Sequence, residues 1–339
     1  MPSGTVSPGL RLAIVGASSL KGKELKEVLK QRLFPVSKLA LLDDNEAVGQ
    51  LTEFEGEPAL VQSVDADTFT QSDLVFLAST RGAFTREQWP RAAAGTAALV
   101  DLTHALLDVP EAVPRVPFLE EALPHRASSD RRWFIAPHAA AVVLLTLLIR
   151  LSAAFRLRQM VANIFEPVSE RGAAGLEELK EQTVRLLSFQ EFPRTVFDAQ
   201  VAFNLLPRYG TASRARLEES EDTIRREVER CAPAFAERLA LQVIQAPIFH
   251  SHCLSVLVEF EGRVELSAVE QALQGRPLVV VPQDEAPATV VDVAGREDIV
   301  VGPVLRDRNR PAAVWLWAVA DNLRLAASTA VEIAEKVVA

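Results

Sequence analysis

The sequence of 339 residues contains few cysteines and no apolar run long enough to cross a bilayer. Its two cysteines, Cys231 and Cys253, are too sparse for a disulfide framework and form no CxxC pair of the kind that binds zinc. The longest apolar stretch, residues 139–149, is about half of the roughly 20 residues that a membrane helix needs. The N-terminal residues lack the basic start and apolar core of a signal peptide. We therefore expect a cytoplasmic protein without membrane association.

The chain also lacks an excess of positive charge. Lys and Arg total 36 against 45 for Asp and Glu, which gives a net charge of −9. A general nucleic-acid binder would show a basic face, so we expect no nucleic-acid partner. A site for a small molecule or nucleotide needs only one or two placed cations, and this class of partner stays open. The length predicts two domains, and an apolar fraction of 49% is ample for their cores.

Short, uninterrupted apolar runs alternate with helical segments through the first half of the chain. Strands that are apolar on both faces are typical of a parallel sheet covered by helices on both sides. Residues 20–33 place their apolar side chains largely along one helical face, as such a covering helix would. The pattern predicts an α/β domain. The predicted strands are residues 12–15, 39–42, 74–78, 98–100 and 133–136.

A glycine-containing turn follows the first predicted strand. Gly16 and Gly22 supply two of the three small positions that let a backbone approach a pyrophosphate at a helix N-terminus, and Ser18 and Ser19 lie between them. Asp43 ends the second strand, where a carboxylate accepts hydrogen bonds from an adenosine ribose and repels a 2′-phosphate. We expect these residues to bind NAD in preference to NADP. The alternative is a structural relic of the turn, in which Asp43 only begins a solvated loop.

Segments along nearly the whole chain resemble, in order, those of the aspartate-semialdehyde dehydrogenase family, an NAD(P)-dependent aldehyde dehydrogenase family of amino-acid biosynthesis. Residues 99–103 are also similar to the Usg-type homologues within it. The resemblance implies a Rossmann-type NAD(P)-binding domain over 1–137 with 320–339, and an α+β dimerisation domain over 138–319. It also implies a homodimer and a C-terminal helix that returns to the first domain. The segments are residues 11–18, 34–42, 99–103, 165–172, 177–182, 247–252 and 319–324.

The resemblance implies catalytic positions that this chain fills unusually. Ala140 occupies the position of the nucleophilic cysteine, and a methyl group cannot form a covalent acyl-enzyme. Gln245 stands at the position of an arginine that binds the substrate carboxylate, and a glutamine lacks the charged fork of that side chain. Glu166 replaces a glutamine of the substrate site. His252 matches the acid/base histidine, and Asn322 aligns with a residue that contacts the dinucleotide.

These substitutions favour a homologue that lacks the acyl-enzyme chemistry and keeps the fold, the dimer and NAD binding. One alternative is an active NAD(P)-dependent oxidoreductase that acts on an aldehyde or oxo group through His252. Another is aspartate-semialdehyde dehydrogenase activity with an unusual nucleophile. A dimeric scaffold that binds a protein partner is the last alternative.

Neighbouring histidines and cysteines offer little further chemistry. Cys253 follows His252, but adjacent side chains of a strand point to opposite faces, so we expect Cys253 and also Cys231 to be structural. His138 is expected to cap a helix or to line a ligand cleft. His250 and His252 would share one strand face and could bind a metal with His138. Nothing else in the sequence supports that site, and we expect no metal.

Overall fold

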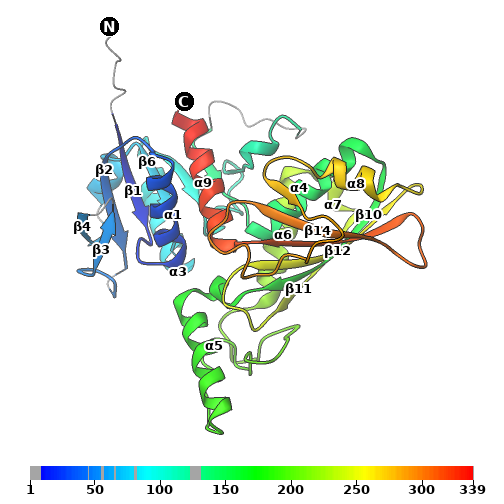
Figure 1. Cartoon of the computed structure of the whole chain (residues 1–339). Helices are drawn as coiled ribbons and strands as arrows, with labels where there is room; N and C mark the ends of the chain where they lie inside the picture. The colour runs from blue at the N-terminus through cyan, green and yellow to red at the C-terminus, as the bar shows by residue number, and fades with distance from the viewer. Residues whose placement is uncertain are drawn as a thin grey trace. The chain divides into compact units, whose positions relative to one another are not determined.

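The chain divides into two compact units. The computed structural model describes residues 9–44, 46–54, 57–64, 66–79, 82–122 and 131–338. The first unit comprises Met1–Pro117, Ala127–Ala136 and Ala327–Ala339, and the second comprises Phe118–Arg126 and Pro137–Ala326. The second unit thus extends to Ala326, whereas the sequence analysis placed its limit at 319. Figure 1 shows the elements of both units.

The first unit contains a parallel sheet, as the apolar runs predicted. Its strand order is β5-β2-β1-β6-β7-β9-β8, and every pairing between neighbouring described strands is parallel. A separate hairpin pairs β3 with β4. The strands are β1 (Leu10–Val15), β2 (Val36–Asp43), β3 (Leu51–Phe54), β4 (Glu57–Leu60), β5 (Gln62–Ser63), β6 (Leu74–Leu77), β7 (Ala98–Asp101), β8 (Val113–Pro114) and β9 (Trp133–Ile135).

Apolar clusters cover both faces of this sheet, because successive side chains of a strand point to opposite sides. Leu12 and Ile14 of β1 join the cluster of one face, and Ala13 and Val15 join that of the other. The C-terminal helix contributes its part from Ala327 onward to the first of these clusters, which confirms that it returns to this unit. The helices of this unit are α1 (Leu20–Gln31), α2 (Ala66–Thr70), α3 (Gly82–Ala93) and the greater part of α9 (Asn322–Val338).

The second unit contains a mixed sheet of order β11-β10-β12-β15-β14-β13. Its central pairings β10–β12, β12–β15 and β15–β14 are antiparallel, and the outer pairings β10–β11 and β14–β13 are parallel. This arrangement confirms the expected α+β domain. The strands are β10 (Leu157–Glu166), β11 (Leu239–Gln245), β12 (His252–Phe260), β13 (Leu278–Val280), β14 (Ile299–Arg306) and β15 (Ala313–Ala320).

Helices cover one face of the mixed sheet (Figure 1). Helix α4 (Ala139–Ala154) is apolar around its whole circumference, and such a helix must be buried. It packs on β10, β12 and β15, while α6 (Leu217–Cys231) packs on β11 and α8 (Leu266–Ala272) on β14. The remaining elements are the helices α5 (Gly172–Leu187) and α7 (Pro233–Ala236) and the 3-10 turns η1 (Pro117–Leu119) and η2 (Val168–Arg171).

One expectation about this unit was wrong. Strand β11 ends at Gln245, and Pro247, which has no N–H to offer a ladder, follows the end of the strand. His250 lies in a bend before β12, so it does not share a strand face with His252. Across the described residues, we find no helix with the length and hydropathy that crossing a membrane requires.

Candidate functional site

The N-terminus of α4 holds Ala140, the position where a sulfur would be expected. His138 caps this helix, because its Nδ1 accepts the N–H of Ala140 at 3.3 Å. The backbone N–H of His138 donates to Oε2 of Glu227 at 2.7 Å, and both residues are buried. The capping role expected for His138 is thus confirmed. Ala140 itself is fully buried and offers only a methyl group.

His252 begins β12 and lies against this helix cap. Its ring meets the ring of His138 edge to face, with centroids 5.1 Å apart, and its side chain is fully buried. The preceding residue, Ser251, has a φ of +75°, which is an uncommon conformation for a residue other than glycine. The amide of Ser251 donates to Oδ1 of Asn322 at 3.0 Å. This contact holds the unusual backbone from which His252 projects.

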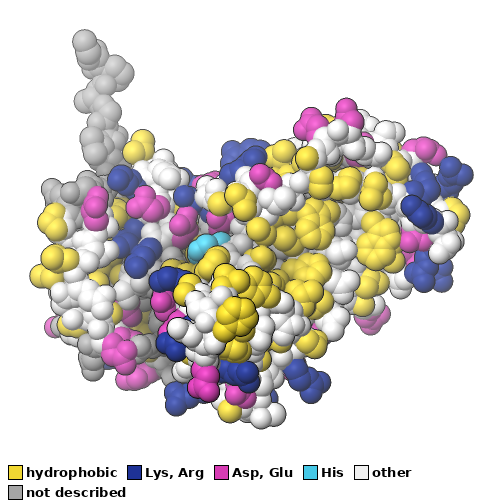
Figure 2. All heavy atoms as spheres, turned by 60° about the horizontal axis from the view of Figure 1, so that its bottom comes forward, with side chains coloured by type: hydrophobic (Ala, Val, Ile, Leu, Met, Phe, Trp, Pro, Cys, Tyr) yellow, Lys and Arg dark blue, Asp and Glu magenta, His cyan; other side chains and the backbone are white. Residues whose placement is uncertain are grey.

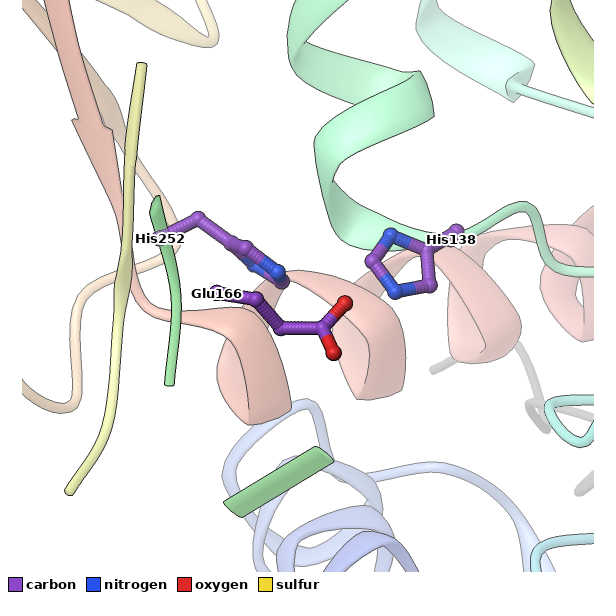
Figure 3. A group of neighbouring side chains, drawn as sticks. All are labelled: His138, Glu166 and His252. Atoms are coloured by element: carbon purple, nitrogen blue, oxygen red, sulfur yellow. The ribbon is translucent and has the colours of Figure 1, made fainter. Parts of the chain in front are cut away.

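Glu166 ends β10 and completes a cluster with the two histidines. One ligand-type atom from each of His138, Glu166 and His252 lies within 4.8 Å of the others, and all three residues are buried. Figure 3 shows the three side chains converging from different segments of the chain. Arg171 donates to Oε1 of Glu166 at 2.7 Å, and Ser220 donates to the same oxygen at 3.3 Å. The carboxylate is therefore held in one orientation.

Gln245 is bonded entirely within the protein, at the position where the resemblance implies a substrate arginine. Its Oε1 accepts from the Tyr209 hydroxyl at 2.6 Å, and its Nε2 donates to the carbonyls of Glu166 at 2.8 Å and Ala246 at 2.9 Å. Arg171 donates through Nε to the same Tyr209 oxygen at 3.0 Å. These contacts join Gln245 and Glu166 into one polar network.

The charges of this network compensate one another. Burial alone would lower the pKa of Arg171, but Glu166, Tyr209 and Glu170 together raise it above the ordinary value. Burial raises the pKa of Tyr209, while the neighbouring guanidinium opposes that shift. Arg171 therefore stays charged and Tyr209 stays neutral at physiological pH. The Arg171 guanidinium already forms an ion pair with Glu166 within the protein.

Asn322, expected to contact a dinucleotide, is buried at the start of α9 and bonds to three residues of the second unit. Its Oδ1 accepts the Ser251 amide, and its Nδ2 donates to Oε1 of Glu170 at 2.8 Å and to Oγ of Ser169 at 3.1 Å. Glu170 in turn places Oε2 3.8 Å from Nε2 of His138. The side-chain amide of Asn322 thus links the residue before His252 with Glu170, which lies near His138.

The glycine-containing turn of the first unit has the geometry of a tight strand-to-helix connection. Ser19 caps α1: its hydroxyl accepts the Gly22 N–H at 2.9 Å and donates to the carbonyl of Ala78 at 2.7 Å. Ser18 donates through both its N–H and its hydroxyl to Oδ2 of Asp43. The turn and the end of β2 are therefore joined directly.

Both glycines of this turn are required by close packing. Gly16 has a φ of +88°, and a Cβ there would lie 2.3 Å from the amide nitrogen of Ser79. A Cβ on Gly22 would lie 2.2 Å from the carbonyl oxygen of Gly16. These two residues permit the turn itself, whether or not a phosphate also approaches it.

The two cysteines lie in buried positions, as expected. Burial raises the pKa of Cys253 to about 11, and burial together with Glu227 raises that of Cys231 to about 12. Both are therefore thiols near neutral pH, and the thiolate is the reactive form. Cys253 belongs to an apolar cluster with Val300 and Val319, on the sheet face opposite to that of His252.

The structure brings together five of the positions singled out in the second unit and adds others that the sequence did not indicate. Contacts or short distances join His138, Glu166, His252, Gln245 and Asn322 through their neighbours, whereas the glycine turn and Asp43 form a separate group in the first unit. The sequence analysis missed four members: Glu170, Arg171, Tyr209 and Glu227. For Glu170 and Arg171, the available signal was the group of charged residues in the segment 165–172.

Comparisons with known proteins cover nearly the whole chain. Residues 11–124 match the family described as semialdehyde dehydrogenase, NAD binding domain, and residues 148–325 match semialdehyde dehydrogenase, dimerisation domain. A USG-1 protein homolog of Azotobacter vinelandii is 33% identical over 97% of this chain and 98% of its own length.

Solved structures agree with the sequence matches. A probable aspartate-semialdehyde dehydrogenase from Pseudomonas aeruginosa is 31% identical with a TM-score of 0.87, over 97% of this chain and 98% of its own. Aspartate semialdehyde dehydrogenase II from Vibrio cholerae, complexed with ASA, is 25% identical with a TM-score of 0.86, over 98% and 99%. The chain belongs to the semialdehyde dehydrogenase family and contains both its NAD-binding and its dimerisation domain.

Proposed function

We propose that this protein is a divergent semialdehyde dehydrogenase homologue that lacks the acyl-enzyme chemistry. The observation that supports this most strongly is the pairing of His252 with the helix cap beside Ala140. The acid/base position is present next to the helix start, and the residue there has no group that can attack an aldehyde.

Neither cysteine can replace the missing nucleophile. Cys253 adjoins His252 in sequence but projects from the other sheet face into an apolar cluster. Cys231 is buried at the end of α6. Raised pKa values keep both side chains as thiols at neutral pH. The conclusion therefore does not depend on Ala140 alone.

The polar network also opposes the family substrate. An acyl phosphate is doubly anionic and needs cationic groups to bind it. Gln245 is neutral and directs its amide to Tyr209 and to two carbonyls. Arg171 is paired with Glu166, which adds negative charge at the position of a neutral family residue. The site has thus diverged at several positions together.

The first unit supports retained dinucleotide binding, with NAD preferred over NADP. In this proposal Gly16, Ser18, Ser19 and Gly22 form the pyrophosphate turn, and Asp43 faces the ribose. A carboxylate at that position repels a 2′-phosphate. Asn322 is the cofactor residue proposed from the second unit.

A second candidate is an NAD(P)-dependent oxidoreductase that acts on an aldehyde or oxo group without a covalent step. The convergence of His252, His138 and Glu166 favours it, because imidazoles and carboxylates are the usual proton-transfer groups. A partner-binding scaffold is the remaining candidate. A protein that does not bind NAD would fit this candidate and neither of the other two.

We also infer a homodimer that forms through the sheet face not covered by helices. Several side chains on this face are only partly buried, and they include Phe165 of β10 and Trp315 and Trp317 of β15. Figure 2 shows hydrophobic side chains gathered over a broad area of this unit. Sedimentation of Trp315→Asp should show monomers, whereas Leu33→Asp, which changes an exposed apolar residue of the first unit, should leave the dimer intact.

Intact-mass spectrometry tests the proposed function. After incubation with aspartate semialdehyde and NAD(P)+ without phosphate, we expect the unmodified protein mass, because no thioester can form. A covalent acyl adduct would contradict the proposal. If the second candidate holds, a screen of other aldehydes would show NADH formation that His252→Ala abolishes.

A further inference from the structure

Three buried side chains of metal-binding type converge in the second unit. His138 precedes α4, Glu166 ends β10 and His252 begins β12, so the cluster joins positions far apart in the sequence. Figure 3 shows the two imidazoles and the carboxylate directed toward one another. Two imidazoles with one carboxylate are a donor set that zinc and other divalent transition metals accept.

The separations suit a single ion after small side-chain rotations. The candidate ligand atoms all lie within 4.8 Å of one another. Tetrahedral ligands about 2.1 Å from an ion lie about 3.4 Å apart, so the most widely separated pair needs to close by up to about 1.4 Å. We place this movement in the ring of His252 and in Oε2 of Glu166, while Oε1 keeps its bonds to Arg171 and Ser220.

Neighbouring residues hold Glu166 and the backbone before His252 as outer-shell partners hold metal ligands. Arg171 and Ser220 bond Oε1 of Glu166, and the Ser251 amide bond to Asn322 fixes the backbone before His252. Coordination through Nε2 of His138 leaves the proton on Nδ1. The 3.3 Å bond from the Ala140 amide would then be released, which is a small loss beside the free energy of metal binding.

The local charge favours a cation. The carboxylate of Glu166 belongs to the cluster and is paired with Arg171, and Oε2 of Glu170 lies 3.8 Å from Nε2 of His138. Buried carboxylates are stabilised by pairing or by metal coordination. A divalent ion bound to Glu166 and the two imidazoles would contribute in this way.

We propose that His138, Glu166 and His252 bind one divalent transition-metal ion, with zinc as the expected class. Three protein ligands leave a further coordination position for water or a carbonyl oxygen, as in catalytic zinc sites. The site departs from the sequence-based expectation of no metal, because Glu166 supplies the ligand that His250 does not. It is independent of the proposed function, since a metal can bind whether or not an aldehyde is oxidised.

Cobalt titration of the untagged, full-length protein tests the site after dialysis against a chelator. We expect one Co²⁺ per chain, with visible absorption bands of nitrogen and oxygen ligation, no thiolate charge-transfer band, and displacement by one equivalent of Zn²⁺. His252→Ala and His138→Ala should each raise the Kd for Zn²⁺ at least tenfold. His250→Ala, two positions away and outside the cluster, should leave it unchanged.

Two results would overturn the proposal. One is the absence of stoichiometric Co²⁺ binding to the wild-type protein. The other is a Kd for Zn²⁺ that His252→Ala leaves equal to that of His250→Ala. Circular dichroism verifies that each variant is folded, and His252→Gln and His138→Gln replace any alanine variant that is not. Failure here leaves the proposed function standing, because mass and turnover measurements test that separately.

Discussion

The imidazole rings of His138 and His252 meet edge to face, with their centroids 5.1 Å apart and their planes inclined at 62°. His138 caps α4, and Ala140 is the second residue of that helix. The residue expected to transfer protons thus adjoins the helix start where an alanine stands in place of a nucleophile. In the proposed function, the site lacks the nucleophile that the family resemblance implies at position 140, and the imidazole expected to act with it is present.

Placing a cysteine at position 140 should not create aspartate-semialdehyde dehydrogenase activity. We expect Ala140→Cys to show no more phosphate-dependent oxidation of aspartate semialdehyde than the wild type. The reason is that Gln245 is neutral and Arg171 is paired with Glu166, so the substrate anions lack cationic partners. The measurement is NAD(P)H absorbance, with Ala140→Ser as the matched control. Substantial turnover by Ala140→Cys alone would show that the substrate pocket is intact.

Removing one partner of the buried ion pair should destabilise the protein strongly. Arg171→Met leaves the Glu166 carboxylate buried without its cation, which costs about 3–5 kcal/mol. The double variant with Glu166→Gln should lose less, because no uncompensated charge remains. Urea unfolding measures the difference, with Arg225→Met, in a more exposed pair with Glu221, as a control that costs about 1 kcal/mol or less. Equal losses for the single and double variants would refute the pairing argument.

The turn after β1 should tolerate no side chain at Gly22. A Cβ there would meet the carbonyl oxygen of Gly16 at 2.2 Å, so we expect Gly22→Ala to cost about 1–3 kcal/mol through overpacking. The control is Gly262→Ala, because a Cβ on Gly262 has nothing within 4 Å. Thermal unfolding followed by circular dichroism compares the two. If both variants melt at the wild-type temperature, the turn has room for a side chain at position 22, which would contradict this prediction.

Calorimetry should show tighter binding of NAD than of NADP. The carboxylate of Asp43 ends β2 and is held by Ser18, so its negative charge is fixed beside the turn. Asp43→Ser should reduce the preference, and Asp44→Ser, at the next position, should retain it. Binding of NADP as tight as that of NAD by the wild-type protein would contradict the role proposed for Asp43.

Local sequence signals predicted the first unit well. The apolar runs became parallel strands because each run is short enough to cross the sheet once and is buried on both faces. Gly16 and Gly22 marked the turn because their small size is a local requirement. The bonds of Ser18 to Asp43 and of Ser19 to Ala78 depend on strand order, and the turn pattern contained no sign of them.

The second unit shows why the site was only partly predictable. His252 and Ala140 followed from the family resemblance, and the capping role of His138 followed from its place before an apolar helix. The sequence indicated Glu166 only as an altered substrate residue. Its approach to both histidines was not predictable, because it requires three separate segments to meet. His250 was expected to share a strand face with His252, but the chain leaves the sheet after Gln245 and His250 lies in a bend before β12.

Steady-state oxidation of aspartate semialdehyde distinguishes a homologue without acyl-enzyme chemistry from an active family enzyme. Purified protein is assayed with phosphate and with NAD or NADP, beside a reaction without protein and beside the His252→Ala variant. The account predicts that the wild-type protein and His252→Ala both show only the background rate. Phosphate-dependent turnover by the wild type that His252→Ala abolishes would contradict it, because acyl-enzyme chemistry would then proceed without a cysteine at position 140.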